Sequence, residues 1–314
     1  MIRLLLEHVF SLFCLVFWWL ISGLIILTTA EAQNVTAVQT PKTYTTAIDT
    51  SARTWLWEIS GKKLKKPSYL MGTIHLVWAE HFAWPAQFEA KFKASKQLIL
   101  EVDMDDPGLI FATMIGSQMK NDTTIDQLLS AADFALVDSF FKNKLEMDIA
   151  MFKSWKPMLL QTILLQDEKT NKPTKSVEME LVQLAKEKQK EVLGLETIEE
   201  QFAIFDKIPY TEQANYLLEA IKDGDKSMTE FETIMKIYTE KNVNAAAAVM
   251  NTDTKFGKYE DLLMGNRNKN WIDKIKNYTK QKPSFFAVGA AHLGGENGVL
   301  NLLQKAGYTI KPVL

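Results

Sequence analysis

The chain has 314 residues, of which 47% are hydrophobic and 24% charged, a composition typical of a globular protein. With only 14 glycines and 9 prolines, it is neither a disordered nor a collagen-like protein. Its 36 basic and 38 acidic residues give a net charge of -2, so no basic excess points to a nucleic acid and no acidic tail to a basic partner. A chain of this length buries roughly 75% of its unfolded surface and needs no disulfide or metal to hold a core.

The N-terminal segment has the pattern of an export signal. An uncharged apolar run spans residues 9–28 after Arg3, and Ala30-Glu31-Ala32 follows as a small-residue cleavage site. We predict that residues 1–32 are a cleaved signal peptide. A retained membrane anchor is the alternative, because the run is long enough to span a bilayer. Both alternatives place the remainder in the periplasm or outside the cell, with membrane contact only through residues 9–28.

Cysteine usage narrows the possible chemistry. Cys14 is the only cysteine, and it lies inside the apolar run. The exported part therefore has no disulfide, no thiol nucleophile and no cysteine metal ligand. Any catalysis there depends on histidine, carboxylate, hydroxyl, lysine or tyrosine side chains.

After a polar, threonine-rich linker at residues 33–50, the sequence predicts one domain over residues 51–314. Its first part alternates between strands and a helix, which is typical of parallel strand pairing. The predicted strands cover residues 54–59, 68–75 and 97–103, and the predicted helix covers residues 85–95.

From about residue 107 to residue 272 the pattern is mainly helical. Thr124, Ser176 and Thr197 stand where helix N-caps are expected. One apolar strand, residues 191–196, interrupts this region. The predicted helices are residues 125–144, 155–167, 176–189, 197–206, 210–223 and 227–240.

The C-terminal part returns to the early pattern, with a strand at residues 284–289, a helix within residues 294–307 and a strand at residues 308–313. We therefore predict a mixed α/β fold. Its sheet is built from both ends of the chain, and a large helical insertion separates them.

Two short motifs stand at the ends of apolar strands. Gly72-Thr73-Ile74-His75 and Gly289-Ala290-Ala291-His292 are both G-x-x-H, and Glu101 ends a third strand. Ligand sites of open α/β sheets form beyond the carboxyl ends of the strands, so these residues are expected to share one crevice. Two imidazoles and a carboxylate are a plausible ligand set for a divalent metal, which would activate water and polarise a carbonyl.

Each of these residues also has a structural explanation. A lone histidine is more often a hydrogen-bonded structural residue than a ligand, and Glu101 can be a solvated strand end. By local pattern alone, Glu196 is an acid beside a helix N-terminus, and Arg267-Asn268 belongs to a polar surface stretch. His81 lies among aromatic residues and is predicted to pack rather than to bind metal. Nucleotide-binding loops, G-x-S-x-G and H-E-x-x-H are absent.

Five segments together resemble the TraB/GumN family. They are YLMGTIHL, LILEVDM, VLGLETIEEQ, RNKNW and FFAVGAAHLGGENGVLNLLQKAGYTIKPV, and the resemblance extends from about Thr54 to Leu314. It implies a fold similar to the EreA/ChaN-like α/β proteins. It also implies kinship with Tiki-type proteases, which depend on manganese or cobalt and cleave an extracellular signalling protein near its N-terminus.

The resemblance also implies roles for individual residues. The family's two G-x-x-H histidines match His75 and His292, and its strand-end glutamate matches Glu101. Its L-E-T motif matches Glu196, and its R-N motif matches Arg267 and Asn268. Where members often have V-D-x-x-L, this chain has Val177-Glu178-Met179-Glu180-Leu181, which leaves the role of Glu178 open.

The first functional hypothesis is an exported metal-dependent hydrolase, a peptidase with a peptide or protein substrate and Mn, Co or Zn as the metal. His75 and His292 would bind the metal, and Glu101 would be its third ligand or the general base. Arg267 would stabilise charge on the attacked carbonyl, with Asn268 in the same catalytic group. Glu196 would fix a histidine tautomer.

Two other hypotheses remain. The first is a non-catalytic envelope protein that holds a metal, a haem-like ligand or a partner in the same crevice. The second is a structural protein in which the two G-x-x-H motifs only terminate strands.

Overall fold

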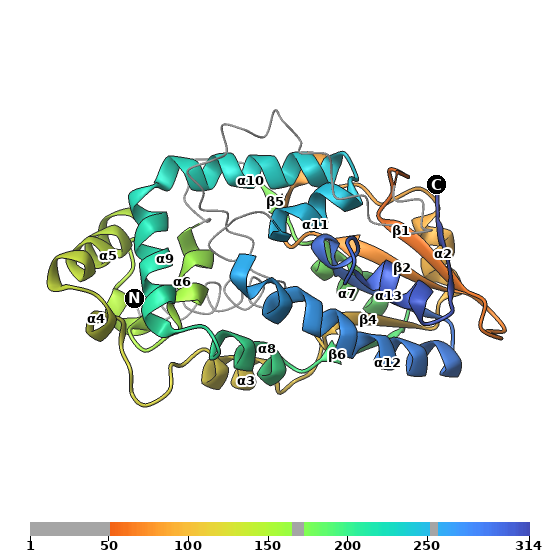
Figure 1. Ribbon diagram of the computed structural model, residues 1–314, viewed down its shortest axis with the longest axis horizontal. Helices are drawn as coiled ribbons and strands as arrows, with labels where there is room; N and C mark the ends of the chain where they lie inside the picture. Colours follow the sequence, from red (N-terminus) through yellow and green to blue (C-terminus); the bar gives the residue numbers. More distant parts are fainter. Residues whose placement is uncertain (1–50, 165–172, 252–256) are drawn as a thin grey trace. The chain divides into compact units, whose positions relative to one another are not determined.

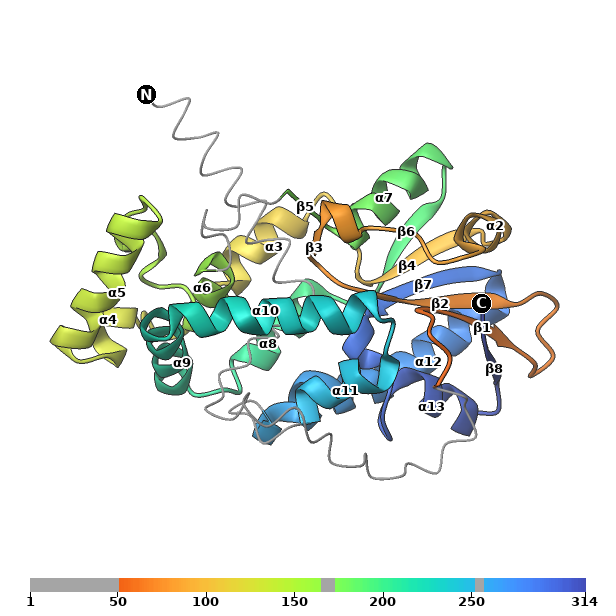
Figure 2. The same cartoon turned by 90° about the horizontal axis from the view of Figure 1, so that it is seen from above.

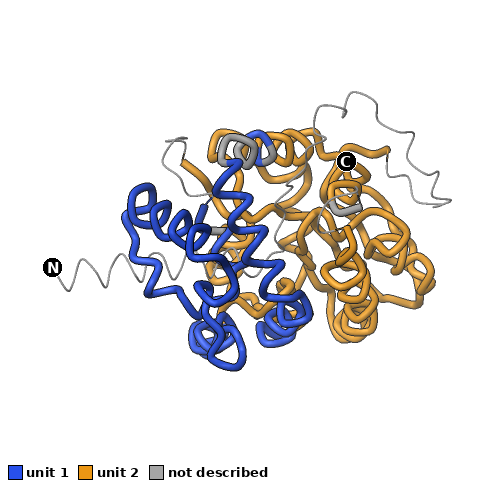
Figure 3. Tube along the Cα trace, turned by 60° about the vertical axis from the view of Figure 1, so that its left-hand side comes forward, with its two compact units in different colours: residues 1–28, 106–171, 197–231 blue, residues 29–105, 172–196, 232–314 orange. Residues whose placement is uncertain are grey.

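The computed structural model describes residues 51–164, 173–251 and 257–314. The predicted signal segment and linker lie outside these ranges. Within the described ranges, no helix has both the length and the apolar character needed to cross a membrane. The chain forms two compact units (Figure 3). In the described part of the chain, unit 1 contains residues 106–164 and 197–231, and unit 2 contains residues 51–105, 173–196, 232–251 and 257–314.

Unit 2 is built on a six-stranded sheet with the order β6-β4-β7-β2-β1-β8. The strands are β1 (Leu56–Ser60), β2 (Ser68–Thr73), β4 (Gln97–Val102), β6 (Glu191–Glu196), β7 (Ser284–Gly289) and β8 (Thr309–Pro312). β7 pairs in parallel with both β2 and β4, and β4 pairs in parallel with β6. β1 is antiparallel to its neighbours β2 and β8. The prediction of a mixed sheet from both ends of the chain is confirmed.

Helices cover both faces of this sheet. In Figure 2, α2 (Phe88–Ala94) and α7 (Val177–Glu187) lie on one face, and α12 (Asn266–Gln281) and α13 (Val299–Lys305) lie on the other. Every residue of β2, β4 and β7 is consequently buried. This burial explains why the three strands read as continuous apolar runs rather than as alternating patterns.

Two very short strands join distant parts of unit 2. β3 (Val77–Trp78) pairs with β5 (Thr174–Lys175), which fastens the segment after His75 to the segment before α7. Strands of two residues are too short to produce a periodic pattern, and the sequence did not predict them.

The remaining described elements are helical. They are α3 (Leu109–Gly116), α4 (Ile125–Leu128), α5 (Ala131–Lys144), α6 (Pro157–Leu164), α8 (Ile198–Phe205), α9 (Tyr210–Lys222), α10 (Gly224–Thr239), α11 (Val243–Asn251) and the short helices η2 (Ala79–His81), η3 (Ile149–Phe152), η5 (Gly257–Tyr259), η6 (Asp261–Gly265) and η7 (Ala290–His292). Their order along the chain can be followed in Figure 1. Helices α3 to α6, α8 and α9 make up most of unit 1.

The predicted N-caps are confirmed. Thr124 and Thr197 each form a capping box with a residue three positions later, and the Ser176 hydroxyl accepts from Met179 N. The prediction of one continuous helix over residues 125–144 is wrong. Ser130 caps a second helix there, because its hydroxyl accepts the backbone N–H of Asp133.

Candidate functional site

Four parallel strands of unit 2 end at one edge of the sheet, and each brings a predicted residue there. His75 follows β2 by two positions, Glu101 is the penultimate residue of β4, and Glu196 is the last residue of β6. η7 follows β7 directly and carries His292. β2 and β7 are hydrogen-bonded neighbours, so the two G-x-x-H motifs come together as the sequence predicts.

Gly289, the last residue of β7, forms the floor of this site. A Cβ atom here would lie 3.3 Å from Glu101 Oε1, 3.5 Å from His292 Cδ2 and 3.8 Å from His75 Nε2. Its φ of -49° is accessible to any residue. The glycine is therefore needed for space, and the absence of a side chain leaves room between the two imidazoles and the carboxylate.

Glu101 is a buried carboxylate held by two donors. Its Oε1 accepts the backbone N–H of Gly289 at 2.8 Å, and its Oε2 accepts from Arg267 at 2.6 Å. Burial raises the pKa of the Glu101 carboxyl; Arg267 opposes this shift and the nearby Glu196 adds to it. Oε1 lies 3.8 Å from His292 Nε2, so this oxygen faces the histidine pair.

Arg267 binds two of the strand-end carboxylates at once. Its guanidinium donates to both oxygens of Glu196 and to Glu101 Oε2. One nitrogen, Nη1, donates to the carbonyl of Leu263 at 3.1 Å and faces His292 Nε2 at 3.3 Å. Although burial opposes its charge, Glu196 and Glu101 raise the pKa of Arg267. The guanidinium therefore serves as a permanent buried counter-ion.

Helix α12 positions Arg267 through its first two turns. A π-helical turn, η6, leads directly into α12, and such turns are frequent at functional sites. Trp271 is one helical turn after Arg267 and lies under the guanidinium, with 5.0 Å between its ring and Cζ. The same indole lies 4.5 Å from the His292 ring, so it supports both side chains.

His292 has a partner on each ring nitrogen. Nδ1 lies 2.5 Å from Asn268 Oδ1, which can only accept a hydrogen bond. Nδ1 therefore carries the proton, and Nε2 presents a lone pair toward Arg267 and Glu101. Burial lowers the pKa of His292 well below its usual value of 6.5, and the charges of Arg267 and His75 lower it further. Both effects favour the neutral form of this imidazole.

His75 is oriented by a carboxylate that the sequence left in doubt. Its Nδ1 lies 2.8 Å from Glu178 Oε1, and both side chains are largely buried. Burial opposes ionisation of Glu178, but the charge of His75 and its hydrogen bond outweigh burial and lower the pKa of the carboxyl. Ser176, the N-cap of α7, also donates to Glu178 Oε2 at 3.2 Å. With Nδ1 bound to Glu178, the other nitrogen of His75, Nε2, faces the space above Gly289.

The donor chemistry of this site fits a divalent metal. Both histidines have one nitrogen fixed by a partner and the other directed inward, which is the usual arrangement of metal-binding imidazoles. At this site three buried carboxylates, those of Glu101, Glu178 and Glu196, stand against one buried guanidinium, that of Arg267, so negative groups are in excess. A divalent cation would balance this excess. Among the described residues, no three His, Cys, Asp or Glu side chains already stand in a metal-holding arrangement.

The exposure and contacts of the side chains test the structural explanations that local sequence pattern gave for individual residues. Arg267 is not a surface cation, because its side chain is only 8% exposed and lies between Glu101 and Glu196. Glu101 is not a solvated strand end. Glu196 precedes the α8 N-cap as predicted, and its carboxylate binds Arg267. His81 is exposed and lies 5.7 Å from the Trp78 ring.

The structure gives specific roles to Asn268, which was expected at the site, and to Glu178, whose role was left open, and it adds Trp271, which sequence reasoning missed. Asn268 fixes the tautomer of His292, Glu178 orients His75, and Trp271 packs against His292. Arg267 and Trp271 are four residues apart in the region whose pattern is mainly helical, and this spacing is the signal that would have placed the tryptophan beside the arginine. No comparable local signal links Glu178 to His75, which precedes it by about a hundred residues.

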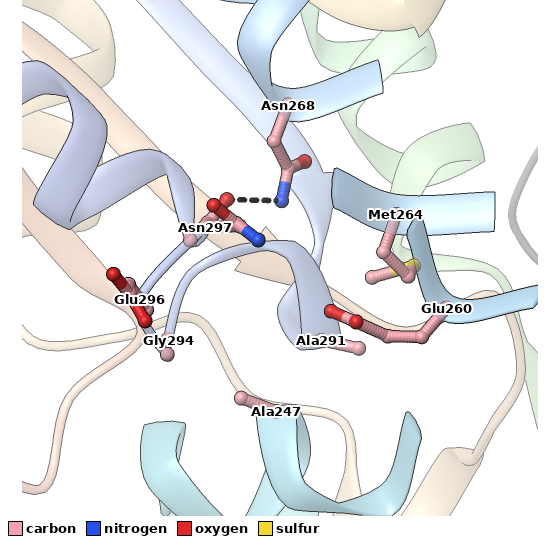
Figure 4. Close-up of a pocket in the computed structure, with 10 residues that line it drawn as sticks. Ala247, Glu260, Met264, Asn268, Ala291, Gly294, Glu296 and Asn297 are labelled. Carbon is pink, nitrogen blue, oxygen red and sulfur yellow. Dashed lines mark hydrogen bonds between the residues drawn. The ribbon is translucent and has the colours of Figure 1, made fainter. Parts of the chain in front are cut away.

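A small polar hollow lies beside Asn268 (Figure 4). Glu260, Met264 and the loop at residues 294–298 line it. Asn268 belongs to both places, because its Nδ2 donates to the carbonyl of Asn297 at 2.9 Å while its Oδ1 bonds His292. Burial and the charge of Asp261 raise the pKa of Glu260.

Comparison with known proteins identifies a family and two relatives. The family model described as TraB/PrgY/gumN family matches residues 55–312. The uncharacterized protein YbaP of Shigella flexneri is 25% identical over 251 residues, which cover 76% of this chain and 88% of the relative. YbaP of Escherichia coli strain K12 is 24% identical over 250 residues, covering 75% and 87%. No solved structure matches the chain.

The matched region contains every strand of the sheet and all the residues gathered at its edge, from His75 to His292. The chain belongs to the TraB/PrgY/gumN family.

Proposed function

We propose that the protein is an exported metal-dependent hydrolase that acts on peptides. The observation that carries this proposal is that His75 Nε2, the His292 ring and Glu101 Oε1 all lie within 3.8 Å of the position that a Cβ atom at Gly289 would take. The excess of buried carboxylates over the one buried guanidinium at this site supports a bound cation there. Export is supported by the signal pattern of residues 1–32.

In this proposal His75 and His292 hold the metal through their Nε2 atoms. Glu178 and Asn268 keep the opposite nitrogens occupied, so that both lone pairs remain directed inward. Bound there, the metal would lower the pKa of water and polarise a substrate carbonyl. Glu101 offers Oε1 to the same space, as a third ligand or as the base that accepts the proton of the attacking water. Mn, Co and Zn are all compatible with this donor set.

The decisive experiment is calorimetric titration of the full chain with Mn²⁺, Co²⁺ and Zn²⁺. We expect one binding site, lost in the His75→Ala/His292→Ala double variant. His81→Ala is the matched control, because this histidine is exposed in the same unit and should leave binding unchanged. Absence of binding by the folded protein, or equal binding by the double variant, would overturn the metal site.

A peptide library then tests the hydrolase itself. Cleavage by the wild type that disappears in both single histidine variants, while circular dichroism shows an intact fold, is the expected result. Unchanged turnover by either variant would exclude the assigned mechanism.

One observation favours the non-catalytic alternative. In the structure, each N–H of Arg267 already points at an acceptor within the protein: Glu101, Glu196, the Leu263 carbonyl or His292 Nε2. No N–H is left for a substrate carbonyl. A protein that binds a metal or an organic ligand without turnover is consistent with such a saturated site. Tight metal binding with no cleavage across the library would favour this alternative.

A further inference from the structure

Arg267 has five N–H groups, and each has a position in the structure. Nε–H donates to Glu196, and the two N–H groups of Nη2 serve Glu101 and Glu196. Nη1 donates to the carbonyl of Leu263 and faces His292 Nε2. A further acceptor, such as a substrate oxygen, can therefore bind Arg267 only by replacing one of these partners.

The contact with His292 is the weakest of the set. The bonds to Glu101 and Glu196 join the guanidinium to carboxylates of opposite charge, whereas Leu263 and His292 offer neutral acceptors. The contact with His292 spans 3.3 Å and ends on a neutral ring nitrogen, longer than the bonds to Glu101 at 2.6 Å and to Leu263 at 3.1 Å. Nη1 is thus the nitrogen that can release a donor at least cost.

The same ring nitrogen is the one that a metal would need. Because Asn268 Oδ1 holds the proton on Nδ1, the only lone pair of the His292 ring is on Nε2. One lone pair serves either the N–H of Arg267 or a metal ion. The two partners exclude each other at this atom.

We propose that Arg267 and a divalent cation compete for His292 Nε2, so that cation binding releases one Arg267 N–H and creates a subsite for a carbonyl or carboxylate oxygen beside the cation. This inference rests on the proposed function and adds an order of binding, in which the cation binds first and the oxygen ligand second. Without the cation, every N–H of Arg267 has an acceptor within the protein, and none is available to an added ligand. With the cation in place, the freed N–H and the cation face the same small space at Gly289, and an oxygen ligand placed between them relieves their mutual repulsion.

Two consequences can be measured. Binding of the cation and of an oxygen ligand is cooperative, with part of the coupling carried by Arg267. A variant in which residue 267 keeps its positive charge but lacks a second nitrogen should bind the cation more tightly. In this variant, the coupling between cation binding and oxygen-ligand binding should be weaker. Arg267→Lys is that variant, because its single ammonium group can remain beside Glu101 and Glu196 without reaching His292.

The test measures Zn²⁺ binding to the full chain by calorimetry, with and without acetohydroxamate, a chelating ligand that carries a carbonyl oxygen. We expect Arg267→Lys to bind Zn²⁺ roughly 2- to 10-fold more tightly than the wild type, the range that corresponds to removing one competing hydrogen bond. Its gain in Zn²⁺ affinity on adding acetohydroxamate should be smaller by a similar factor. Arg53→Lys is the matched control, because Arg53 is exposed in the same unit.

A measurement on the wild type does not depend on the folding of the variant. The chain has only three arginines, Arg3, Arg53 and Arg267, so ¹⁵N-arginine labelling gives few signals. On adding Zn²⁺, we expect the Nη1 signals of Arg267 to move while its Nε–H, bound to Glu196, stays in place.

The outcomes separate the two proposals. If the folded wild type binds no Zn²⁺, the metal site itself is wrong and the inference falls with it. If the wild type binds Zn²⁺ but the Nη1 signals do not move, and Arg267→Lys has unchanged affinity and coupling, only the competition is overturned.

Discussion

Both histidines of the site have one ring nitrogen occupied by another side chain, but the two partners differ in charge. Asn268 gives His292 a neutral acceptor, whereas Glu178 gives His75 a carboxylate. A carboxylate partner makes an imidazole a more basic ligand than an amide does. His75 is therefore expected to be the stronger of the two metal ligands.

This difference leads to a prediction for Glu178→Gln. The glutamine keeps the size of the side chain and a hydrogen-bonding group near His75, but it removes the charge. We expect Zn²⁺ affinity, measured by calorimetry, to fall by roughly 10- to 100-fold, the usual effect of losing such a partner. Glu180→Gln on the same helix is the control, since Glu180 binds Lys175 at the surface. Equal affinities for the two variants would show that Glu178 does not position His75.

At the scale of elements, the two G-x-x-H glycines occupy neighbouring strands but meet different surroundings. A Cβ on Gly72 of β2 would lie 2.7 Å from Leu293 Cδ1 and 3.2 Å from the Cα of Ala290. Gly72 thus lets η7 pack closely against the sheet. Gly289 of β7 instead keeps the space of the site open. One motif glycine serves packing and the other serves the site.

Substitution of each glycine by alanine separates these roles. Gly72→Ala is expected to lower the free energy of unfolding by about 1–3 kcal/mol, the usual cost of overpacking a core. Gly289→Ala is expected to change it by less than about 1 kcal/mol, because its backbone angles suit alanine. The added methyl should nevertheless weaken Zn²⁺ binding at least tenfold.

Urea denaturation and calorimetry on the two variants check this prediction, and each variant is the control for the other. Strong destabilisation by Gly289→Ala, with metal binding intact, would contradict the assignment.

At the scale of the whole molecule, each of the two units contains buried charged side chains, but these lie in different surroundings. Unit 2 gathers its buried charges at the proposed site, whereas unit 1 buries Lys156 inside a helical cluster. Lys156 binds Asp206 at 3.1 Å and lies over the Phe202 ring. Burial opposes ionisation of Asp206, but hydrogen bonds from Tyr210, Lys120 and Lys156 outweigh it and lower its pKa. Burial lowers the pKa of Lys156 as well.

The pH dependence of stability follows from Asp206. Because its pKa is lower in the folded state, its contribution is fully present above the unfolded value of about 3.9 and is lost as the pH falls through the folded value. Asp206→Asn should lower the free energy of unfolding by about 3–5 kcal/mol at neutral pH, because Lys156 remains buried without its counter-ion. The difference from the wild type should shrink below about pH 4.

Urea titrations at several pH values check this, with Asp138→Asn on α5 of the same unit as the control. A difference between Asp206→Asn and the wild type that stays constant down to pH ~2 would rule out the assigned ion pair.

Local sequence patterns predict much of the fold. The strands at β2, β4 and β7 are predicted because continuous apolar runs mark strands that are covered on both faces. The N-caps at Thr124, Ser176 and Thr197 are equally local, since a cap and its partner lie three residues apart. The break at Ser130 is also local, but the helical pattern on both sides concealed it.

The sequence by itself determined the six strands of the main sheet, the caps and the two histidine motifs, because each of these depends on neighbours within a few residues. Only the tertiary structure decided that β7 lies between β2 and β4, that Arg267 is buried between Glu101 and Glu196, and that Glu178 orients His75. These partners are separated by about 70 to 220 positions along the chain. No periodicity extends over such distances, and the pairing is chosen by the burial of both sheet faces and by the need to neutralise buried charge.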